Sequence, residues 1–435
     1  MTDLPEHLTQ LLQNSQLARH SAGVTVALRI GSEKFASMIG QSSLTFQQPL
    51  QRKTLFNIGS LTKHMIAVAV VELAQLGKLS LFDPLSQYLH EAHIRTWGGI
   101  SLINLLSHTS GIPDCHSYFL WDQPTSYKTI VAGLSCKDAD FLPGQAWAYS
   151  NSNYLLLGAV IEAVTGFKLR HFLDDHLFAS AGLPHARSDS TWSVIPDRAE
   201  PYEIVRGNFV HAPRLHPTVT SLGGFGALFS IDDFLVWSEA LYSGDRENYH
   251  QDCLTPVKLS DGMELPYGFG WYLGIMRGRS FAWHMGAPPG FRTIHLHLPS
   301  EKIAMSLSTN TSIEKTILKR VAFEILEQVL PRSTFLSIEP TEPASPLERQ
   351  AVQALLKNKG EAPPQGILTE AMQYTWLCSP GSKPMNSIEL EDCWLLEQHR
   401  LGGGTIKNYA AKAEGSLHHF SILWTEDQKI ASLAM

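Results

Sequence analysis

The sequence predicts an α+β fold, in which an antiparallel sheet built from both ends of a long segment is flanked by the helices that lie between them. Two strand patterns around a turn at residues 31–33 open this segment. Helical patterns alternate with loops from about residue 101 to 240, and four strand patterns followed by one helix close it. This order favours a sheet that joins the two ends, with helices packed against it.

The composition is that of a globular protein. The chain has 435 residues, of which 44% are hydrophobic and 17% charged, so it can bury the cores of roughly two or three domains. Its net charge of −7 is too weak to indicate a nucleic-acid-binding or membrane-surface protein. Five widely spaced cysteines indicate reduced thiols rather than disulfides or a zinc site.

The cellular location of the protein is predicted from two features that its sequence lacks. No apolar run reaches the length of about 18 residues that indicates a membrane span. The first residues, "MTDLPEHLTQLLQNSQ", lack the basic start and apolar stretch of a signal peptide. We therefore expect a cytoplasmic protein that does not enter a membrane.

Most elements have a recognisable beginning or end. The helix that starts near Ser60 is closed by Gly77, and the helix "SNYLLLGAVIEAVT" is closed by Gly166. Ser230 and Asp233 are placed as an N-cap pair for the helix that follows them. The closing strands are "YGFGWYLGI", "RSFAWHMG", "RTIHLHLP" and "KIAMSLSTN", and the last helix is "TSIEKTILKRVAFEILEQVL".

A proline-rich stretch divides the chain. We predict one domain over residues 1–333, a linker over 334–345 and a small, mostly β domain over 346–435. Ser345 and Pro346 are typical of the N-cap and first position of a helix that opens this second domain.

Ser60 and Lys63 form a Ser-x-x-Lys pair at the head of an apolar helix. The pattern alone is weak, because about two chance matches are expected in a chain of this composition. A second match, Ser312 to Lys315, is explained by a capping box of Thr311 and Glu314. The first is followed by apolar residues on every side of the helix, which predicts burial: Met65, Ile66, Val68, Val70, Val71, Leu73 and Leu76.

Burial of this helix would make Lys63 a base. Positions three apart share a helix face, so Lys63 would lie beside Ser60 inside the protein. Burial lowers the pKa of a lysine, and a neutral amine can take the serine proton. The alternative is an N-cap serine followed by a lysine whose amine reaches the solvent.

Two further patterns carry polar groups suited to the same chemistry. Tyr149 and Asn151 precede a buried helix, where a tyrosine can share a proton relay and an amide can orient a carbonyl group. His284 and Gly286 lie on a predicted strand, and Gly286 lets the backbone approach a ligand closely. Taken singly, a loop tyrosine is more often a packing residue, and a lone histidine on a strand is more often simply half-buried.

Together, Ser60-x-x-Lys63, Tyr149-x-Asn151 and His284-x-Gly286 resemble the serine penicillin-recognising enzymes, in particular the class C β-lactamase, esterase and D-aminopeptidase group. The segments "LLSHTSGIP", "PGQAWAYSNSNYLLLG", "LGGFGALFSIDDFLVW" and "PYGFGW" also look like family segments in family order. The resemblance covers residues 20–330 and implies a β-lactamase/transpeptidase-like domain with its site between the sheet and an all-helical region.

The resemblance also implies roles for residues. It makes Ser60 the acylated nucleophile, Lys63 its proton partner and Tyr149 a general base, with Asn151 in contact with the substrate amide. The backbone N–H groups of Ser60 and Ala287 would form the oxyanion hole.

His284 departs from the lysine that β-lactamases and transpeptidases of this group usually carry in the third motif. A neutral imidazole weakens the expectation of a substrate carboxylate and favours amides or esters with a free amine or no charge. The predicted function is therefore a serine hydrolase of D-aminopeptidase, amidase or esterase type, acting through an acyl-enzyme. The alternatives are a β-lactamase or DD-peptidase, and a catalytically silent scaffold.

The remaining histidines are given structural roles. His295 and His297 alternate on one strand face and are expected at the surface, and His108 is expected to be a loop residue. Nothing in the sequence requires a metal or an organic cofactor. The predicted partner is a small molecule or short peptide, with no nucleic acid and no membrane, and a homo-oligomer is compatible with the sequence.

Overall fold

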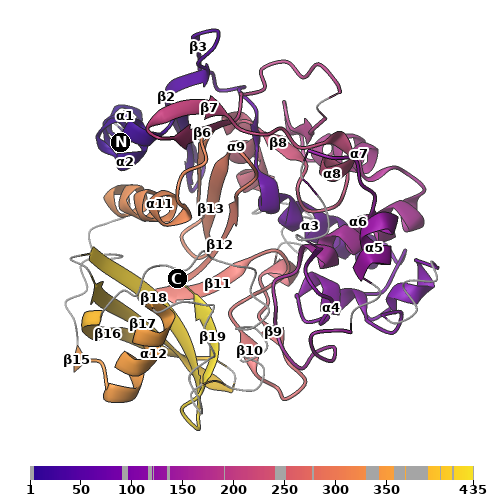
Figure 1. Cartoon of the computed structure of the whole chain (residues 1–435), viewed down its shortest axis with the longest axis vertical. Helices are drawn as coiled ribbons and strands as arrows, with labels where there is room; N and C mark the ends of the chain where they lie inside the picture. The colour runs from indigo at the N-terminus through magenta and orange to yellow at the C-terminus, as the bar shows by residue number, and fades with distance from the viewer. Residues whose placement is uncertain are drawn as a thin grey trace.

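The computed structural model describes residues 4–90, 97–115, 120, 122–134, 138–190, 192–240, 251–276, 279–329, 342–356, 368, 390–401, 403–413 and 416–434. Within these residues the centre of the molecule is a seven-stranded antiparallel sheet, in the order β11-β12-β13-β14-β1-β2-β3 (Figure 1). The strands are β1 (Gly23–Ile30), β2 (Glu33–Ser43), β3 (Gln48–Pro49), β11 (Tyr272–Met276), β12 (Arg279–Gly286), β13 (Arg292–Leu298) and β14 (Ile303–Thr309). Because β1 pairs with β14, the prediction that both ends of the segment share one antiparallel sheet is confirmed.

Three helices cover one face of this sheet. They are α1 (Leu4–Asn14), α2 (Gln16–His20) and α11 (Lys315–Val329), whose apolar sides pack on alternate strand residues such as Val26, Leu296 and Leu307. The prediction that Thr311 and Glu314 form a capping box for α11 is wrong. The helix begins at Lys315, and the hydroxyl of Thr311 instead accepts a hydrogen bond of 2.9 Å from the N–H of Ala22.

A helical region covers the other face, on the right of Figure 1. A 3₁₀ turn, η1 (Gly59–Leu61), leads into α3 (Thr62–Gln75), which is buried along almost its whole length. Gly77 and Gly166 close α3 and α6 (Asn151–Thr165) with positive φ values of 66° and 75°, as predicted. The other helices are α4 (Leu102–Leu106), α5 (Tyr127–Leu134), α7 (Leu169–His171), η5 (Phe172–Phe178), α8 (Pro217–Thr220), α9 (Ile231–Ala240) and the turn η2 (Leu85–Gln87).

Strand alternation decides which histidines face the helical region. His284 of β12 pairs with His295 of β13. The His295 ring stacks on Phe234 of α9, the His297 ring lies near Trp271, and the His284 ring lies near Tyr149. His295 and His297 are 2% and 1% exposed, so the expectation of surface histidines is wrong. The helices that cover this face are contributed by distant segments, which the strand sequence could not reveal.

Short strands connect the loops. One small sheet contains β4 (Phe56–Asn57), β8 (Ala227–Phe229) and β5 (Arg187–Ser188). Two pairs of strands form hairpins: β6 (Tyr202–Val205) with β7 (Asn208–His211), and β9 (Val257–Lys258) with β10 (Glu264–Leu265).

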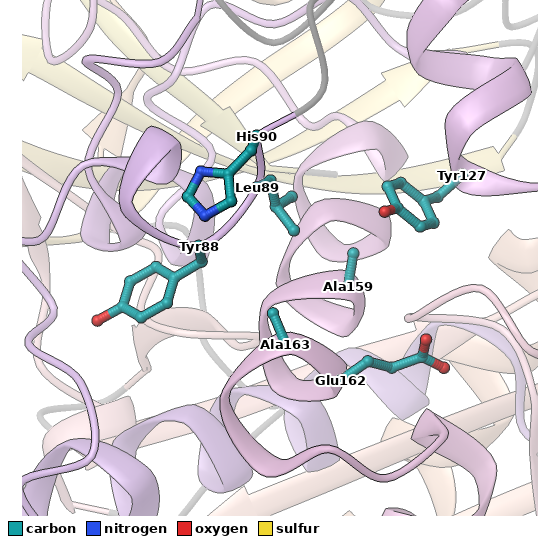
Figure 2. A pocket seen from close by; sticks show the side chains of 7 residues that line it. All are labelled: Tyr88, Leu89, His90, Tyr127, Ala159, Glu162 and Ala163. Carbon is teal, nitrogen blue, oxygen red and sulfur yellow. The ribbon is translucent and has the colours of Figure 1, made fainter.

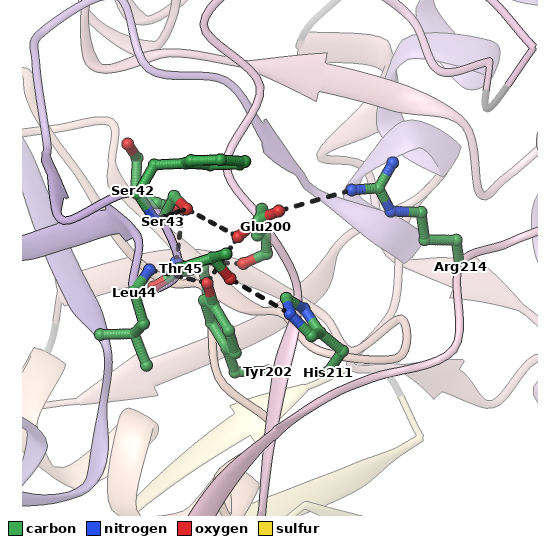
Figure 3. Close-up of polar contacts among 10 residues, drawn as sticks. Ser42, Ser43, Leu44, Thr45, Glu200, Tyr202, His211 and Arg214 are labelled. Atoms are coloured by element: carbon green, nitrogen blue, oxygen red, sulfur yellow. Dashed lines mark hydrogen bonds and ion pairs between the residues drawn. The ribbon is translucent and has the colours of Figure 1, made fainter.

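Figure 3 shows the polar contacts that fix the turn after β2. Glu200 accepts hydrogen bonds of 2.7 Å from Ser43 and Tyr202, and the N–H of Leu44 donates to the Tyr202 hydroxyl. Burial acts to raise the pKa of Glu200, but these hydrogen bonds and the charges of His211 and Arg214 together outweigh it, so the pKa is lowered.

The C-terminal residues form a separate five-stranded sheet, at the lower left of Figure 1. Its elements are β15 (Glu342–Pro343), α12 (Pro346–Leu356), β16 (Leu390–Leu401), β17 (Gly404–Ala413), β18 (Ser416–Thr425) and β19 (Ile430–Ala434). Ser345 and Glu348 cap α12 reciprocally, as the N-cap pattern predicted. The extra, mostly β C-terminal region of the predicted fold is therefore confirmed. The linker boundaries stay a prediction, because residues 334–341 lie outside the described residues.

This C-terminal sheet packs on the first domain near β9 and β10. Ile406 and Leu423 share a cluster with Leu259, Leu265 and Trp147. In addition, Asn408 Nδ2 donates a hydrogen bond of 2.9 Å to the carbonyl of Ile275 on the edge strand β11.

Candidate active site

The nucleophile candidate is held by its own turn and by β8. The N–H of Ile58 donates to Ala227 O at 3.0 Å, and Thr62 Oγ1 accepts from the N–H of Ala227 at 3.1 Å. Ser60 lies between these two anchors at the start of α3 and keeps part of its surface exposed. The local turn therefore fixes the direction of the Ser60 side chain.

Lys63, in the first turn of α3, lies next to Ser60 and is completely buried. Its Nζ is 3.1 Å from Ser60 Oγ, 2.9 Å from Asn151 Oδ1 and 3.5 Å from the carbonyl oxygen of Gly224. The sequence predicted this proximity because the two residues are one helical turn apart. The alternative, in which the lysine amine reaches solvent, is wrong, since the side chain is 0% exposed.

The surroundings of the Lys63 amine explain its chemistry. Burial lowers the pKa of Lys63 to about 7, against a smaller opposing effect of Asp114. Three aromatic rings enclose the amine, with their centres 4.9–5.7 Å from Nζ; they belong to Tyr149, Tyr154 and Phe225. At neutral pH a large share of the molecules thus carries an uncharged amine beside Ser60.

Asn151 connects Lys63 to a carboxylate that the sequence analysis missed. The Asn151 backbone N–H donates to Asp114 Oδ1 at 2.8 Å, and Nδ2 donates to Asp114 Oδ2 at 3.4 Å. The amide oxygen faces Lys63. One signal could have revealed Asp114: it is the only charged residue between Arg95 and Asp122 in the sequence.

Tyr149 lies beside both Ser60 and Lys63, with its ring centre 5.1 Å from Lys63 Nζ. Burial raises its pKa well above the usual value, although a hydrogen bond with Ser60 acts in the opposite direction. Tyr149 is therefore a neutral phenol at rest. Its ring centre is 4.5 Å from that of His108 and 6.1 Å from that of His284.

His284 closes the site from β12. Its Nδ1 lies 2.9 Å from the carbonyl oxygen of Met285, so this nitrogen carries the proton and Nε2 is an acceptor. Burial, and then the charge of Lys63, lower the pKa of His284 to about 3, so the imidazole is neutral.

Gly286 brings β12 against the turn of the nucleophile. A Cβ on Gly286 would lie 1.8 Å from the carbonyl oxygen of Ile58, and one on Gly59 would lie 3.1 Å from the backbone nitrogen of Ala287. The close approach predicted at Gly286 is thus made with the chain itself rather than with a ligand. It brings the backbone nitrogen of Ala287 close to the turn that carries Ser60.

His108 is built into the site more firmly than a loop residue. It is fully buried with a φ of 58°, and its Nδ1 accepts from the Ser150 N–H at 3.2 Å and lies 3.0 Å from Asn153 Nδ2. These contacts hold the segment that carries Tyr149 to the loop before Asp114.

A surface hollow of about 490 Å³ lies elsewhere, on the outer side of α6 (Figure 2). Glu162 is eleven residues beyond Asn151, about 16 Å along the helix. Its carboxylate already accepts from the Leu169 N–H at 2.8 Å and pairs with Lys168 at 3.1 Å. The hollow is lined by Tyr88, Leu89, His90, Tyr127, Ala159, Glu162 and Ala163.

The described ranges contain no group of three His, Cys, Asp or Glu side chains placed to hold a metal ion. None of their helices has the length and apolar character needed to cross a bilayer.

Comparison with known proteins gives concordant matches. The family model described as Beta-lactamase matches residues 7–329. Penicillin-binding protein 4* of Bacillus subtilis (strain 168) is 28% identical over 346 residues, which are 72% of this chain and 74% of that protein. A D-aminopeptidase of Gluconobacter oxydans (strain 621H) is 25% identical over 66% of this chain, and the match spans only 55% of that enzyme.

The fold is also found in solved structures. The D-amino acid amidase from Ochrobactrum anthropi SV3, solved in complex with L-phenylalanine amide, superposes with a TM-score of 0.64 over 75% of this chain and 98% of that one. Sequence identity in this superposition is 22%, so it establishes the shared architecture.

Proposed function

The chain belongs to the beta-lactamase family, a family of serine hydrolases, and we propose that it hydrolyses amides or esters of small amine-bearing or uncharged acyl groups through an acyl-Ser60 intermediate. The relatives described as D-aminopeptidases and a D-amino acid amidase favour D-amino-acid amides as the first substrate class to test.

The observation that carries this proposal is the contact between Lys63 and Ser60. An amine 3.1 Å from Oγ, fully buried and with a pKa of about 7, is placed and tuned to accept the hydroxyl proton. A lysine with its ordinary pKa would be charged and could only donate.

Acylation then follows from the arrangement of the site. The Oγ–H proton of Ser60 passes to Lys63 while Oγ forms a bond to the substrate carbonyl carbon. The carbonyl electron pair moves to oxygen, which the N–H groups of Ser60 and Ala287 stabilise. The bond to the leaving group breaks as that group takes a proton, and water later hydrolyses the acyl-Ser60 ester.

Tyr149 is proposed as the proton donor to the leaving group. Its raised pKa supports a phenol rather than a phenolate at rest, so Lys63 rather than Tyr149 takes the first proton. After Tyr149 has given its proton to the leaving group, the Lys63 ammonium, whose Nζ lies 5.1 Å from the centre of the Tyr149 ring, can return a proton to the phenolate. In this proposal Lys63 takes the general base role of acylation that the resemblance assigned to Tyr149, and Tyr149 acts as the general acid.

The charges in the site support the substrate class. His284 is neutral, Lys63 is uncharged in a large share of the molecules, and the Asp114 carboxyl group lies close to Asn151. A substrate carboxylate would find little positive charge here, whereas an ammonium group would be favoured by Asp114. This argues against a penicillin acid or a peptide C-terminus as the preferred substrate.

The test is a panel of D- and L-amino-acid p-nitroanilides, p-nitrophenyl acetate and nitrocefin, with Ser60→Ala as the control. We expect turnover of the anilides or the ester, little of nitrocefin, and none by Ser60→Ala, whose thermal unfolding should be nearly unchanged. Efficient nitrocefin hydrolysis would overturn the substrate class.

A second measurement separates an enzyme from a scaffold. A fluorophosphonate should label the wild-type protein on Ser60, as located by peptide mass spectrometry. No labelling and no turnover would favour a silent binding protein. The cytoplasmic address, the absence of nucleic-acid binding and the oligomeric state remain predictions from the sequence.

A further inference from the structure

Asp114 makes contacts that orient a neighbouring amide. A carboxylate can only accept hydrogen bonds, so the two Asn151 N–H groups at 2.8 and 3.4 Å must face Asp114. The Asn151 amide oxygen is therefore turned toward Lys63 Nζ, at 2.9 Å. With the amide reversed, its oxygen would face the carboxylate, and Asp114 Oδ2 would lose the N–H group that now lies at 3.4 Å.

Asp114 also differs from its neighbours in charge. Burial is the main cause that raises the pKa of the Cys115 thiol to about 12. Burial also raises the pKa of Tyr149 and Tyr154, so both are neutral phenols. His108 and His284 are neutral because burial lowers the pKa of each imidazole. The titratable groups that interact with Lys63 among the described residues are Asp114, Cys115, His108, Tyr149, Tyr154 and His284.

The effect of this charge on Lys63 has a definite direction. Burial favours the neutral amine, and Asp114 is the strongest influence that opposes it, favouring the ammonium. The balance leaves the amine able to change protonation near pH 7, which a proton relay requires.

We propose that Asp114 is a positioning residue that turns the Asn151 amide toward Lys63 and sets, by its charge, the pH range in which Lys63 can accept the Ser60 proton. The proposal deepens the proposed function and its catalytic part rests on it.

The first test reads Lys63 directly and needs no turnover. In protein labelled with [13Cε]lysine, the Lys63 signal is assigned by its loss in Lys63→Met, and its titration is followed by NMR. In Asp114→Asn, which keeps an acceptor for the Asn151 N–H but removes the charge, we expect the titration midpoint to fall by about 1 unit. Asp122→Asn, at an exposed position outside the site, is the matched control and should leave the midpoint unchanged.

The second test reads catalysis. The acid limb of kcat/KM, or of the rate at which a fluorophosphonate labels Ser60, should move to lower pH in Asp114→Asn by the same amount as the NMR midpoint. A purely structural role would lower the rate at every pH without moving the limb. Asp114→Ala, which also removes the acceptor, should lower kcat about tenfold further.

The outcomes separate the two proposals. An unmoved Lys63 midpoint in Asp114→Asn overturns the role of Asp114, whatever the activity. A moved midpoint with an unmoved acid limb overturns its catalytic part. If wild-type protein neither turns over the panel nor labels at Ser60, the proposed function fails with the catalytic part, while the NMR titration still decides the effect of the charge.

Discussion

Lys63 Nζ lies 3.1 Å from Ser60 Oγ, although the Lys63 side chain has no exposed surface. Burying an amine is unfavourable, and here it is offset only in part by the acceptors Asn151 Oδ1 and Gly224 O. The fold therefore maintains a destabilising group at the position where it is needed to activate a nucleophile.

Replacing Lys63 by methionine should separate activity from stability. We expect kcat to fall by about 10²–10⁴-fold because the nucleophile loses its proton acceptor, while the melting temperature stays equal or rises because a buried amine is removed. Thermal scanning and turnover assays check both. Lys78→Met, at an exposed position beyond the end of α3, is the control and should retain full activity. A loss under tenfold in Lys63→Met would show that the lysine is not the base.

The pH dependence of activity should reflect the lowered pKa of Lys63. Because the neutral amine is the active form and its pKa is about 7, kcat/KM should decline on the acid side by about tenfold per pH unit. Profiles between pH 5.5 and 9, bounded by the pH range in which circular dichroism shows the folded protein, measure this limb. A flat profile down to the acid end would contradict a lysine base.

Acid should also destabilise the fold through its buried histidines. Burial lowers the pKa of His295 to about 3 in the folded chain, from about 6.5 when unfolded. Its contribution is fully present above pH 6.5 and is lost as the pH falls toward 3, because the unfolded chain then binds more protons. One such group can cost about 3 kcal/mol at pH 4.

Urea unfolding at pH 7, 6, 5 and 4 measures this loss. His295→Phe should reduce the steepness of the decline, even if it lowers the absolute stability by leaving the hydroxyl of Ser306 without its partner at 2.6 Å. An unchanged slope in this variant would assign the acid sensitivity to other groups.

Gly286 should tolerate no side chain. A Cβ there would lie 1.8 Å from the Ile58 carbonyl oxygen, so Gly286→Ala must push β12 away from the Ser60 turn and open the site. We expect nearly complete loss of turnover and a lower melting temperature. Gly99→Ala is the matched control, since a Cβ at Gly99 meets nothing within 4 Å. Comparable activity in the two variants would contradict this account.

His108 should act through the segment that carries Tyr149. His108→Ala removes the acceptor of the Ser150 N–H inside the protein, which should cost about 1–3 kcal/mol of unfolding free energy and lower kcat. His108→Asn should recover part of both, because asparagine accepts a hydrogen bond and adopts positive φ more readily than other residues. Equal behaviour of the two variants would indicate that only the ring packing matters.

Much of the architecture was predictable because it depends on local pattern. Strand alternation, the apolar helix after Ser60 and the glycines that close α3 and α6 are properties of neighbouring residues, and the predicted fold class is confirmed. The family was predictable as well, since the spacing of its motifs is itself a sequence property, and the match over residues 7–329 confirms it. The assignment of catalytic roles to these residues stays a prediction.

The sequence by itself determined that Ser60 and Lys63 adjoin, because residues three positions apart share a helix face whatever surrounds that helix. Only the tertiary structure decided what the amine meets there. Asp114, Asn151 and Gly224 reach it from three distant segments, and their meeting depends on how loops and helices pack, which no local pattern encodes. The same packing buried His295 and His297, since a strand has two faces and the partner of each face is chosen by the rest of the chain.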